Sequence, residues 1–165
     1  MNYLAITIPR KELGTRAEAR NQEIERALQL KAEYILMIDT DQTIPILALS
    51  KMFQEIQTYD IVIVDAPNKD KGGSNVTKNP DRTIAYSGMG CVLFRASIFS
   101  QIGKPFFDDR FGYAEKDILN GKLVIKKFGK YQQDNKGEEI DFWFKVKDKF
   151  KIKIIEDPKC NHIEL

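Results

Sequence analysis

Short apolar runs alternate with helix-like segments over the first two thirds of the chain. The β-rich run Tyr3–Ile8 stops at Pro9, and Arg16–Leu30 then places apolar residues at helical spacing between strong helix formers. Tyr34–Ile38 is a continuous apolar run, which is typical of a parallel strand buried on both faces. These segments predict a strand, a helix and a second strand.

A second helix is expected to begin at Pro45, because proline is favoured at the first position of a helix. Its expected apolar face comprises Ile46, Leu47, Leu49, Met52, Phe53 and Ile56. Asp60–Asp65 follows as the next expected strand. The alternation of strands and helices predicts one α/β domain over residues 1–165, with a central, mostly parallel sheet flanked by helices.

The remainder of the chain has a less regular pattern. Residues 67–82 are polar and lack periodicity, which predicts a loop, and we expect its part Asn68–Arg82 to close as a lid. Mixed signals over Asp108–Lys136 predict no particular element. The other expected elements are strands at Ile84–Tyr86, Cys91–Phe94 and Lys151–Glu156, and a helix from Gly137–Glu139 to about Lys149.

Composition and charge narrow the classes of function. The chain is 42% apolar and 30% charged, as expected of a soluble globular protein. Lys and Arg number 26 against 24 Asp and Glu, which argues against a dedicated nucleic-acid binder. No apolar run approaches the roughly 20 residues of a membrane span, and the chain does not open on a signal region. Cys91 and Cys160 form no CxxC pair, so we expect free thiols and a cytoplasmic protein.

Two aspartates, Asp39 and Asp41, directly follow the apolar run Tyr34–Ile38. Residues two apart in an extended chain point to the same side, so both carboxylates are predicted to project from the strand's carboxyl end, where α/β sheets bind ligands. Carboxylates held together repel each other, and a divalent cation relieves the repulsion. Mg²⁺ or Mn²⁺ would bind such oxygens together with substrate phosphates. Alternatively, one Asp caps the following helix and the other is solvated.

Three further carboxylates, Glu138, Glu139 and Asp141, are expected in the first turn of a helix. Acids in this position interact favourably with the helix N-terminus, which is a common surface arrangement. In the functional interpretation, one of them takes a proton from an acceptor hydroxyl while a group is transferred. The two interpretations are compatible.

His162 is the only histidine of the chain. Imidazole is a common ligand of transition metals, so His162 would complete the metal shell if the final strand returned beside that of Asp39. A single histidine near a terminus is otherwise incidental. Lysines alternate at positions 145, 147, 149, 151 and 153. We interpret them as a solvated face, with peripheral contact to an anionic membrane as the alternative.

Three segments in order resemble the family-2-like glycosyltransferases of the GT-A fold. They are Arg20–Leu28 with Ala32–Asp41 and Pro45, then Ser87–Arg95 with Phe99, Ile102–Gly103 and Phe106–Phe107, then Gly137–Lys145 with Ile154–His162. Their order and spacing cover most of the chain. The resemblance implies a compact single catalytic domain with the Rossmann-like fold of nucleotide-diphospho-sugar transferases.

The resemblance also implies roles for individual residues. Asp39 and Asp41 would form the DxD motif, with Asp41 the more direct ligand of Mn²⁺ or Mg²⁺ and His162 the third protein ligand. Glu139 falls at the position of the catalytic base, for which Glu138 and Asp141 are possible substitutes.

Further positions match the family's contacts to its substrates. Gly88 and Gly90 would let the backbone approach the donor sugar, and Arg16, Arg20 or Asn21 would contact the nucleotide. The implied reaction moves a sugar from a nucleotide-diphosphate donor to a hydroxyl of a glycan, protein or lipid, with inversion. The metal would neutralise charge on the leaving diphosphate.

Three other functions compete with this interpretation. Ile35–Thr43 also fits the motif of haloacid-dehalogenase-like phosphatases, in which Asp39 would be the nucleophile. A nucleotidyltransferase would share a similar sheet and metal use. A non-catalytic nucleotide-sugar-binding domain would bind the donor without turnover.

Overall fold

The computed structural model of the protein describes residues 3–8, 14–67, 73–109, 113–119, 122–127 and 138–163. The strands are β1 (Tyr3–Ile8), β2 (Tyr34–Asp39), β3 (Gln42–Thr43), β4 (Ile61–Val64), β5 (Val76–Lys78), β6 (Ile84–Ser87), β7 (Cys91–Arg95), β8 (Tyr113–Leu119), β9 (Lys122–Lys127), β10 (Ile152–Ile155) and β11 (Asn161–His162). The helices are α1 (Arg16–Gln29), α2 (Ile46–Glu55), the 3₁₀ helix η1 (Ala96–Ile98), α3 (Phe99–Ile102) and α4 (Glu138–Val146).

The central sheet has five strands in the order β1-β2-β7-β4-β10. β1 pairs with β2 and β10 pairs with β4 in parallel, whereas β7 lies antiparallel between β2 and β4. Four strands therefore run in one direction and β7 runs against them. The α/β prediction is confirmed at this level, with a mixed sheet in which most strands are parallel.

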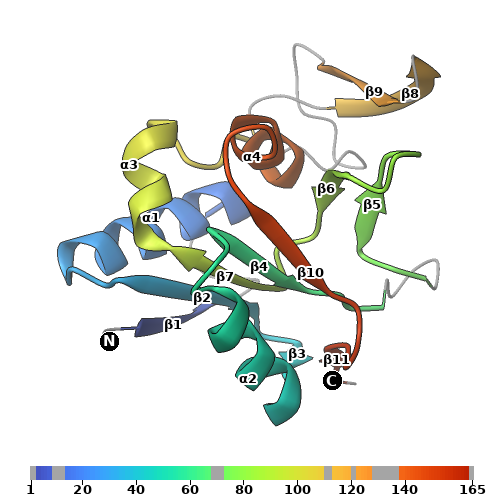
Figure 1. Ribbon diagram of the computed structural model, residues 1–165. Coiled ribbons are helices and arrows are strands. Elements are labelled where there is room, and N and C mark those ends of the chain that lie inside the picture. Colours follow the sequence, from blue (N-terminus) through green and yellow to red (C-terminus); the bar gives the residue numbers. More distant parts are fainter. Residues whose placement is uncertain are drawn as a thin grey trace.

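Helices cover both faces of this sheet, with α1, α3 and α4 on one side and α2 on the other (Figure 1). Successive residues of β2 alternate between the two hydrophobic clusters. Ile35 and Met37 belong to the cluster with α1 and α4, and Tyr34 and Leu36 belong to the cluster with α2. Burial on both faces explains why the sequence of β2 is apolar without interruption.

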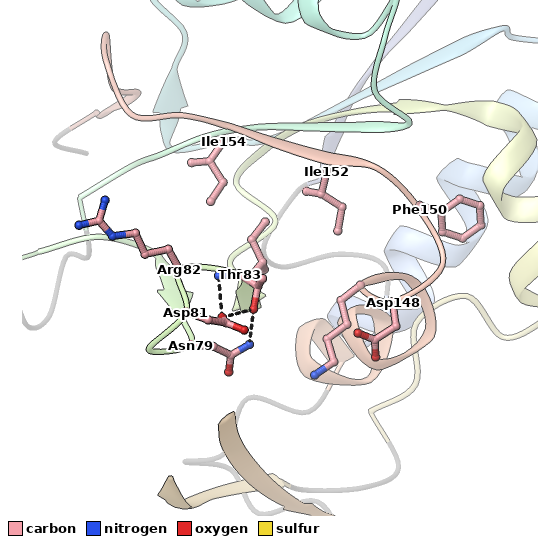
Figure 2. A pocket seen from close by; sticks show the side chains of 10 residues that line it. Asn79, Asp81, Arg82, Thr83, Asp148, Phe150, Ile152 and Ile154 are labelled. Atoms are coloured by element: carbon pink, nitrogen blue, oxygen red, sulfur yellow. Dashed lines mark hydrogen bonds between the residues drawn. The ribbon is translucent and has the colours of Figure 1, made fainter. Parts of the chain in front are cut away.

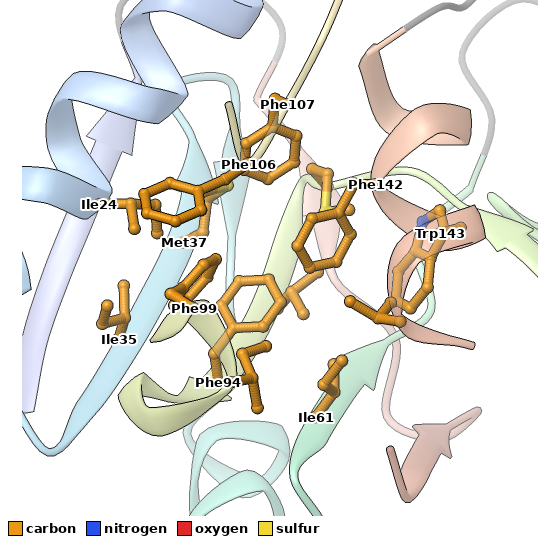
Figure 3. Close-up of a cluster of buried hydrophobic side chains, with 14 of the residues drawn as sticks. Ile24, Ile35, Met37, Ile61, Phe94, Phe99, Phe106, Phe107, Phe142 and Trp143 are labelled. Carbon is orange, nitrogen blue, oxygen red and sulfur yellow. The ribbon is translucent and has the colours of Figure 1, made fainter. Parts of the chain in front are cut away.

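Aromatic rings fix α4 against the sheet (Figure 3). The Phe142 ring stacks on Phe107 with centroids 4.7 Å apart, and it meets Phe94 edge-on at 5.6 Å. The Trp143 Nε1–H donates a 2.5 Å hydrogen bond to the backbone carbonyl of Ser87 in β6. A fully buried indole that is also hydrogen-bonded leaves the helix little freedom to move. The acidic first turn of α4 is therefore carried on a rigid element.

Several short strands lie outside the central sheet. β5 pairs with β6, β8 pairs with β9, and β3 pairs with β11, all antiparallel. The prediction of a loop over residues 67–82 is wrong at Val76–Lys78, because β6 supplies the strand with a pairing partner that is not evident from its polar sequence. Residues 68–72 of the expected lid lie outside the described residues, as do 9–13, 110–112, 120–121 and 128–137.

The apolar face predicted for α2 is partly wrong. Ala48 and Met52 are fully buried, and they lie four residues apart on one face of the helix. Ile46 and Leu47 are 81% and 58% exposed, because they lie at the first turn and away from that face. In the described part of the chain, no helix is both long enough and apolar enough to cross a membrane.

Candidate functional site

The two aspartates of the D-T-D sequence occupy different local structures. Asp39 is the last residue of β2, whereas Asp41 lies in the turn between β2 and β3. The expectation that both carboxylates project from a single strand is wrong in this respect, because the extended conformation ends at Asp39. The Asp39 carboxylate lies 3.5 Å from Arg20 of α1, and the Asp41 carboxylate lies 3.9 Å from the ring of His162.

Pairing of β3 with β11 brings His162 beside Asp41. His162 is the register partner of Gln42, and the Ile163 N–H donates a 2.8 Å hydrogen bond to the Asp41 carbonyl. A return of the final strand beside β2, the condition under which His162 was expected to reach Asp41, does not occur, since β10 pairs with β4. A two-residue strand carries the histidine to Asp41 instead.

The ring of His162 is oriented by a backbone acceptor. Its Nε2 lies 2.8 Å from the carbonyl oxygen of Pro67, and a carbonyl can only accept, so Nε2 carries a proton. In the neutral ring the lone pair is then on Nδ1, the atom 3.9 Å from Asp41 Oδ2. Nδ1 is buried and has no hydrogen-bond partner among the described residues. Metal-binding histidines are commonly held through their other nitrogen in this way.

The donor atoms fit a divalent cation only in part. A carboxylate oxygen suits Mn²⁺ or Mg²⁺, whereas an imidazole nitrogen is a ligand of transition metals and so favours Mn²⁺ over Mg²⁺ at this pair. Within the described ranges, no group of three His, Cys, Asp or Glu residues could hold a metal by itself. Asp39, the other carboxylate expected to bind the metal, lies against Arg20. A cation held by Asp41 and His162 would therefore need substrate oxygens and water to complete its shell.

Arg20 is buried at the centre of the acidic cluster. The residue is 0% exposed, and its Nη1 donates a 3.0 Å hydrogen bond to Glu138 Oε1. Its Nη2 lies 3.5 Å from Glu139 Oε1 and 3.5 Å from Asp39 Oδ1. The exposed Arg16 adds a weaker contact to Glu138 at 3.8 Å. The end of β2 and the start of α4, far apart in sequence, thus meet through one guanidinium.

The three acids of α4 have different surroundings. Glu139 Oε1 also accepts a 3.3 Å hydrogen bond from the Met89 N–H. Asp141 forms a 2.5 Å ion pair with Lys145, one turn further along the helix. Glu138 lines a pocket of about 320 Å³ together with Thr15, Arg16 and Asp109. Among these acids, Glu138 is thus the one that borders this open space.

Gly90 is the site of a close approach between two segments. A Cβ atom added there would lie 2.1 Å from Nε2 of Gln42, so the Gln42 side chain fills the space that the glycine leaves. A Cβ at Gly88 would meet only Asn75, at 3.6 Å. No sequence pattern pointed to Gln42, which is 7% exposed and whose Oε1 has no hydrogen-bond partner in the described residues.

Asn21 makes its contacts with the backbone of Phe107. Its Nδ2 donates to the Phe107 carbonyl at 2.8 Å, and its Oδ1 accepts from the Phe107 N–H at 3.0 Å. Asn21 thereby ties α1 to the segment that follows α3. Both polar ends of this side chain are engaged within the protein.

Asp65, a buried acid that the sequence did not single out, directly follows β4. It is 4% exposed, and it accepts hydrogen bonds from the Ser74 hydroxyl at 2.7 Å and the Asn75 N–H at 3.2 Å. Lys159 lies 3.1 Å away. Its position immediately after an apolar, buried strand is the sequence feature that could have identified it.

Both cysteines are free, buried and adjacent. A hydrogen bond with Cys160 is the largest cause that raises the pKa of the Cys91 thiol far above its ordinary value, and burial raises it further. The Cys91 thiol also lies 4.0 Å from the sulfur of Met52. Cys91 is therefore a neutral core residue rather than a thiolate ligand.

A larger pocket, of about 440 Å³, lies between the β5–β6 turn, the end of α4 and β10 (Figure 2). Its polar wall is a network in which Asp81 accepts from the Thr83 N–H at 3.0 Å and Asn79 Nδ2 donates to the Thr83 hydroxyl at 2.9 Å. Ile152 and Ile154 form part of its apolar wall. None of the residues predicted to act as metal ligands, as the catalytic base or as donor contacts lines this pocket, whereas Asn79, Asp81 and Arg82 belong to the expected lid.

Comparison with known proteins gives a structural likeness without a family. No family model matches the chain, and no curated protein matches its sequence. The crystal structure of A197 from STIV, a viral protein, is similar over 100% of this chain and 87% of that chain, with a TM-score of 0.67 and 14% sequence identity. At this identity the likeness concerns the fold alone.

Proposed function

We propose that the protein is a divalent-metal-dependent glycosyltransferase of the GT-A type. The observation that carries this proposal is the pairing of His162 with Asp41. The imidazole Nδ1 lies 3.9 Å from the carboxylate, and the Pro67 carbonyl holds the opposite nitrogen. The two residues are 121 positions apart in sequence, yet a dedicated strand pair brings them together at the end of β2.

The surroundings of this pair support the same proposal. Asp39 and the acids Glu138 and Glu139 share contacts with Arg20. The carboxylate that activates the acceptor and the end of β2, beside which the metal would bind, would therefore belong to one site. Four of the five central strands run in one direction, as the GT-A resemblance implies for a Rossmann-like sheet.

Each residue then has a defined task. Asp41 and His162 would hold the cation, which when bound neutralises charge on the leaving diphosphate. A carboxylate at the start of α4 would take the proton of the acceptor hydroxyl as it attacks the sugar. Glu139 matches the base position of the family, and Glu138 borders the pocket with Arg16 and so is the alternative.

A thermal-shift screen of nucleotide sugars with and without MnCl₂ tests the proposal, because a ligand that binds the folded state raises the Tm. We expect stabilisation that requires Mn²⁺, and release of the nucleoside diphosphate from the donor that is bound. Asp41→Asn and His162→Ala should abolish the Mn²⁺-dependent shift. As a control, Lys51→Gln removes an exposed hydrogen bond to the Asp157 carbonyl and should keep it.

A turnover assay and a search for a phospho-enzyme, run beside the thermal-shift screen, separate the competing functions. Mn²⁺-dependent binding without turnover would identify a non-catalytic nucleotide-sugar-binding domain. A covalent phosphate on Asp39 after incubation with a phosphomonoester would favour the phosphatase. An unchanged metal response in Asp41→Asn would refute the metal site itself.

A further inference from the structure

The Arg20 side chain is a buried cation among three carboxylates. It is 1% exposed, and it reaches from the second turn of α1 to the start of α4, which lies 118 residues further along the chain. The guanidinium divides its contacts, with Nη1 on Glu138 and Nη2 on Glu139 and Asp39. One side chain therefore links three elements of the candidate site.

Electrostatics make this link strong. Carboxylates gathered at one place repel each other, and a guanidinium in contact with all of them offsets that repulsion. The Glu138 and Glu139 side chains are each 7% exposed, so water screens the interaction poorly. A planar guanidinium can contact partners in several directions, whereas a lysine ammonium is a single point charge.

The burial of Arg20 argues against the nucleotide contact expected from the sequence. A side chain that is 1% exposed has almost no surface to offer a ligand. Arg16, one turn earlier in α1, has a side chain that is 65% exposed, and it lines the pocket beside Glu138. Of these two arginines, Arg16 is therefore the one that a ligand can reach.

We propose that Arg20 is a positioning residue, which holds the acid pair Glu138–Glu139 at a fixed place relative to Asp39. Its consequence for catalysis rests on the proposed function, because it assumes that these carboxylates act on the acceptor and near the metal. The clamp itself is a property of the fold and can be measured without any substrate.

A mutant cycle in thermal denaturation tests the clamp. Arg20→Gln should lower the Tm by roughly 10 °C, because it leaves buried carboxylates without their cation. In a background that already carries Glu138→Gln and Glu139→Gln, Arg20→Gln should lower the Tm by less than about half of that amount. Arg16→Gln is the matched control, and it should cost about 2 °C or less since its ion pair is exposed.

The same mutant cycle can also show that Arg20 acts by packing rather than by charge. The Arg20 guanidinium carbon lies 5.7 Å from the centroid of the Phe107 ring, so the side chain could instead act by packing. An equal loss of Tm in both backgrounds would show that packing is its role, and would overturn the proposal. If Arg20→Gln does not fold, Arg20→Lys takes its place, because it keeps the charge and removes the planar geometry.

Kinetics test the positioning role. With the nucleotide sugar that stabilises the wild type, Arg20→Lys should lower kcat about 10–100-fold at nearly unchanged donor KM. Arg16→Gln should instead raise KM. A raised KM at unchanged kcat in Arg20→Lys would mean that Arg20 binds the donor, against the proposal. Absence of turnover in the wild type would refute the proposed function alone, and the mutant cycle would then decide the clamp.

Discussion

Replacement of Gly90 by alanine should destabilise the protein through one identifiable overlap. The new Cβ would lie 2.1 Å from Nε2 and 2.6 Å from Cδ of Gln42, both far inside contact distance. Overfilling a packed site costs about 1–3 kcal/mol. The amide is the free end of a side chain and can turn aside, but Gln42 is only 7% exposed, so it has to displace neighbours.

A second effect opposes the first. Alanine restricts the unfolded chain more than glycine does, which stabilises the folded state by about 0.4–1 kcal/mol where the backbone is compatible. The difference between the midpoints of the two ranges is a net loss of about 1.3 kcal/mol, which corresponds to a fall in Tm of roughly 3–5 °C for a domain of this size. Gly88→Ala is the matched control. Its Cβ meets Asn75 at an ordinary 3.6 Å, so that variant should be neutral or slightly stabilised.

Urea and thermal denaturation of both variants measure this difference. Adding Gln42→Ala to Gly90→Ala should recover part of the loss, since the overlapping amide is then gone. The reasoning would be refuted if Gly90→Ala were as stable as Gly88→Ala, or if Gln42→Ala gave no recovery in the Gly90→Ala background.

Three further predictions concern the framework of the site. The raised pKa of Cys91 keeps its thiol neutral in the folded state. Above about pH 9 the unfolded state therefore loses a proton that the folded state retains, and the free energy of unfolding should fall by up to about 1.4 kcal/mol per pH unit. Cys91→Ala should flatten this part of a stability–pH curve, and a persistent slope would contradict the cause. Asn21→Ala should cost about 2 kcal/mol in urea denaturation, because both polar groups of Phe107 lose their partners; a change in donor KM with unchanged stability would contradict this. Met52→Ala should cost about 2–5 kcal/mol, whereas Ile46→Ser, at an 81% exposed position, should stay within about 0.5 kcal/mol; equal costs would contradict the burial pattern of α2.

Local chemistry made several elements readable from the sequence. α1 begins where Thr15 and Glu18 form a capping box, and its helical spacing of apolar residues extends to the end of the helix. β2 was predictable because burial on both faces leaves an unbroken apolar run. The acids Glu138 and Glu139 were correctly expected at the start of a helix, since that position depends on neighbours within one turn.

Other features depend on partners that are remote in sequence. β7 lies antiparallel between β2 and β4, and its own residues do not indicate which strands it pairs with. β5 is polar and three residues long, so only its pairing with β6 makes it a strand.

The candidate site was only partly readable for the same reason. The sequence singled out Asp41 and His162 as metal ligands, but a two-residue strand pair decided that they meet. It placed Arg20 at the nucleotide, whereas the fold buries its guanidinium among acids 118 and 119 residues away. Residue spacing determines which face of a helix or strand a side chain occupies. Which charged group that side chain contacts is decided by packing between segments that are distant in sequence, so only the tertiary structure shows it.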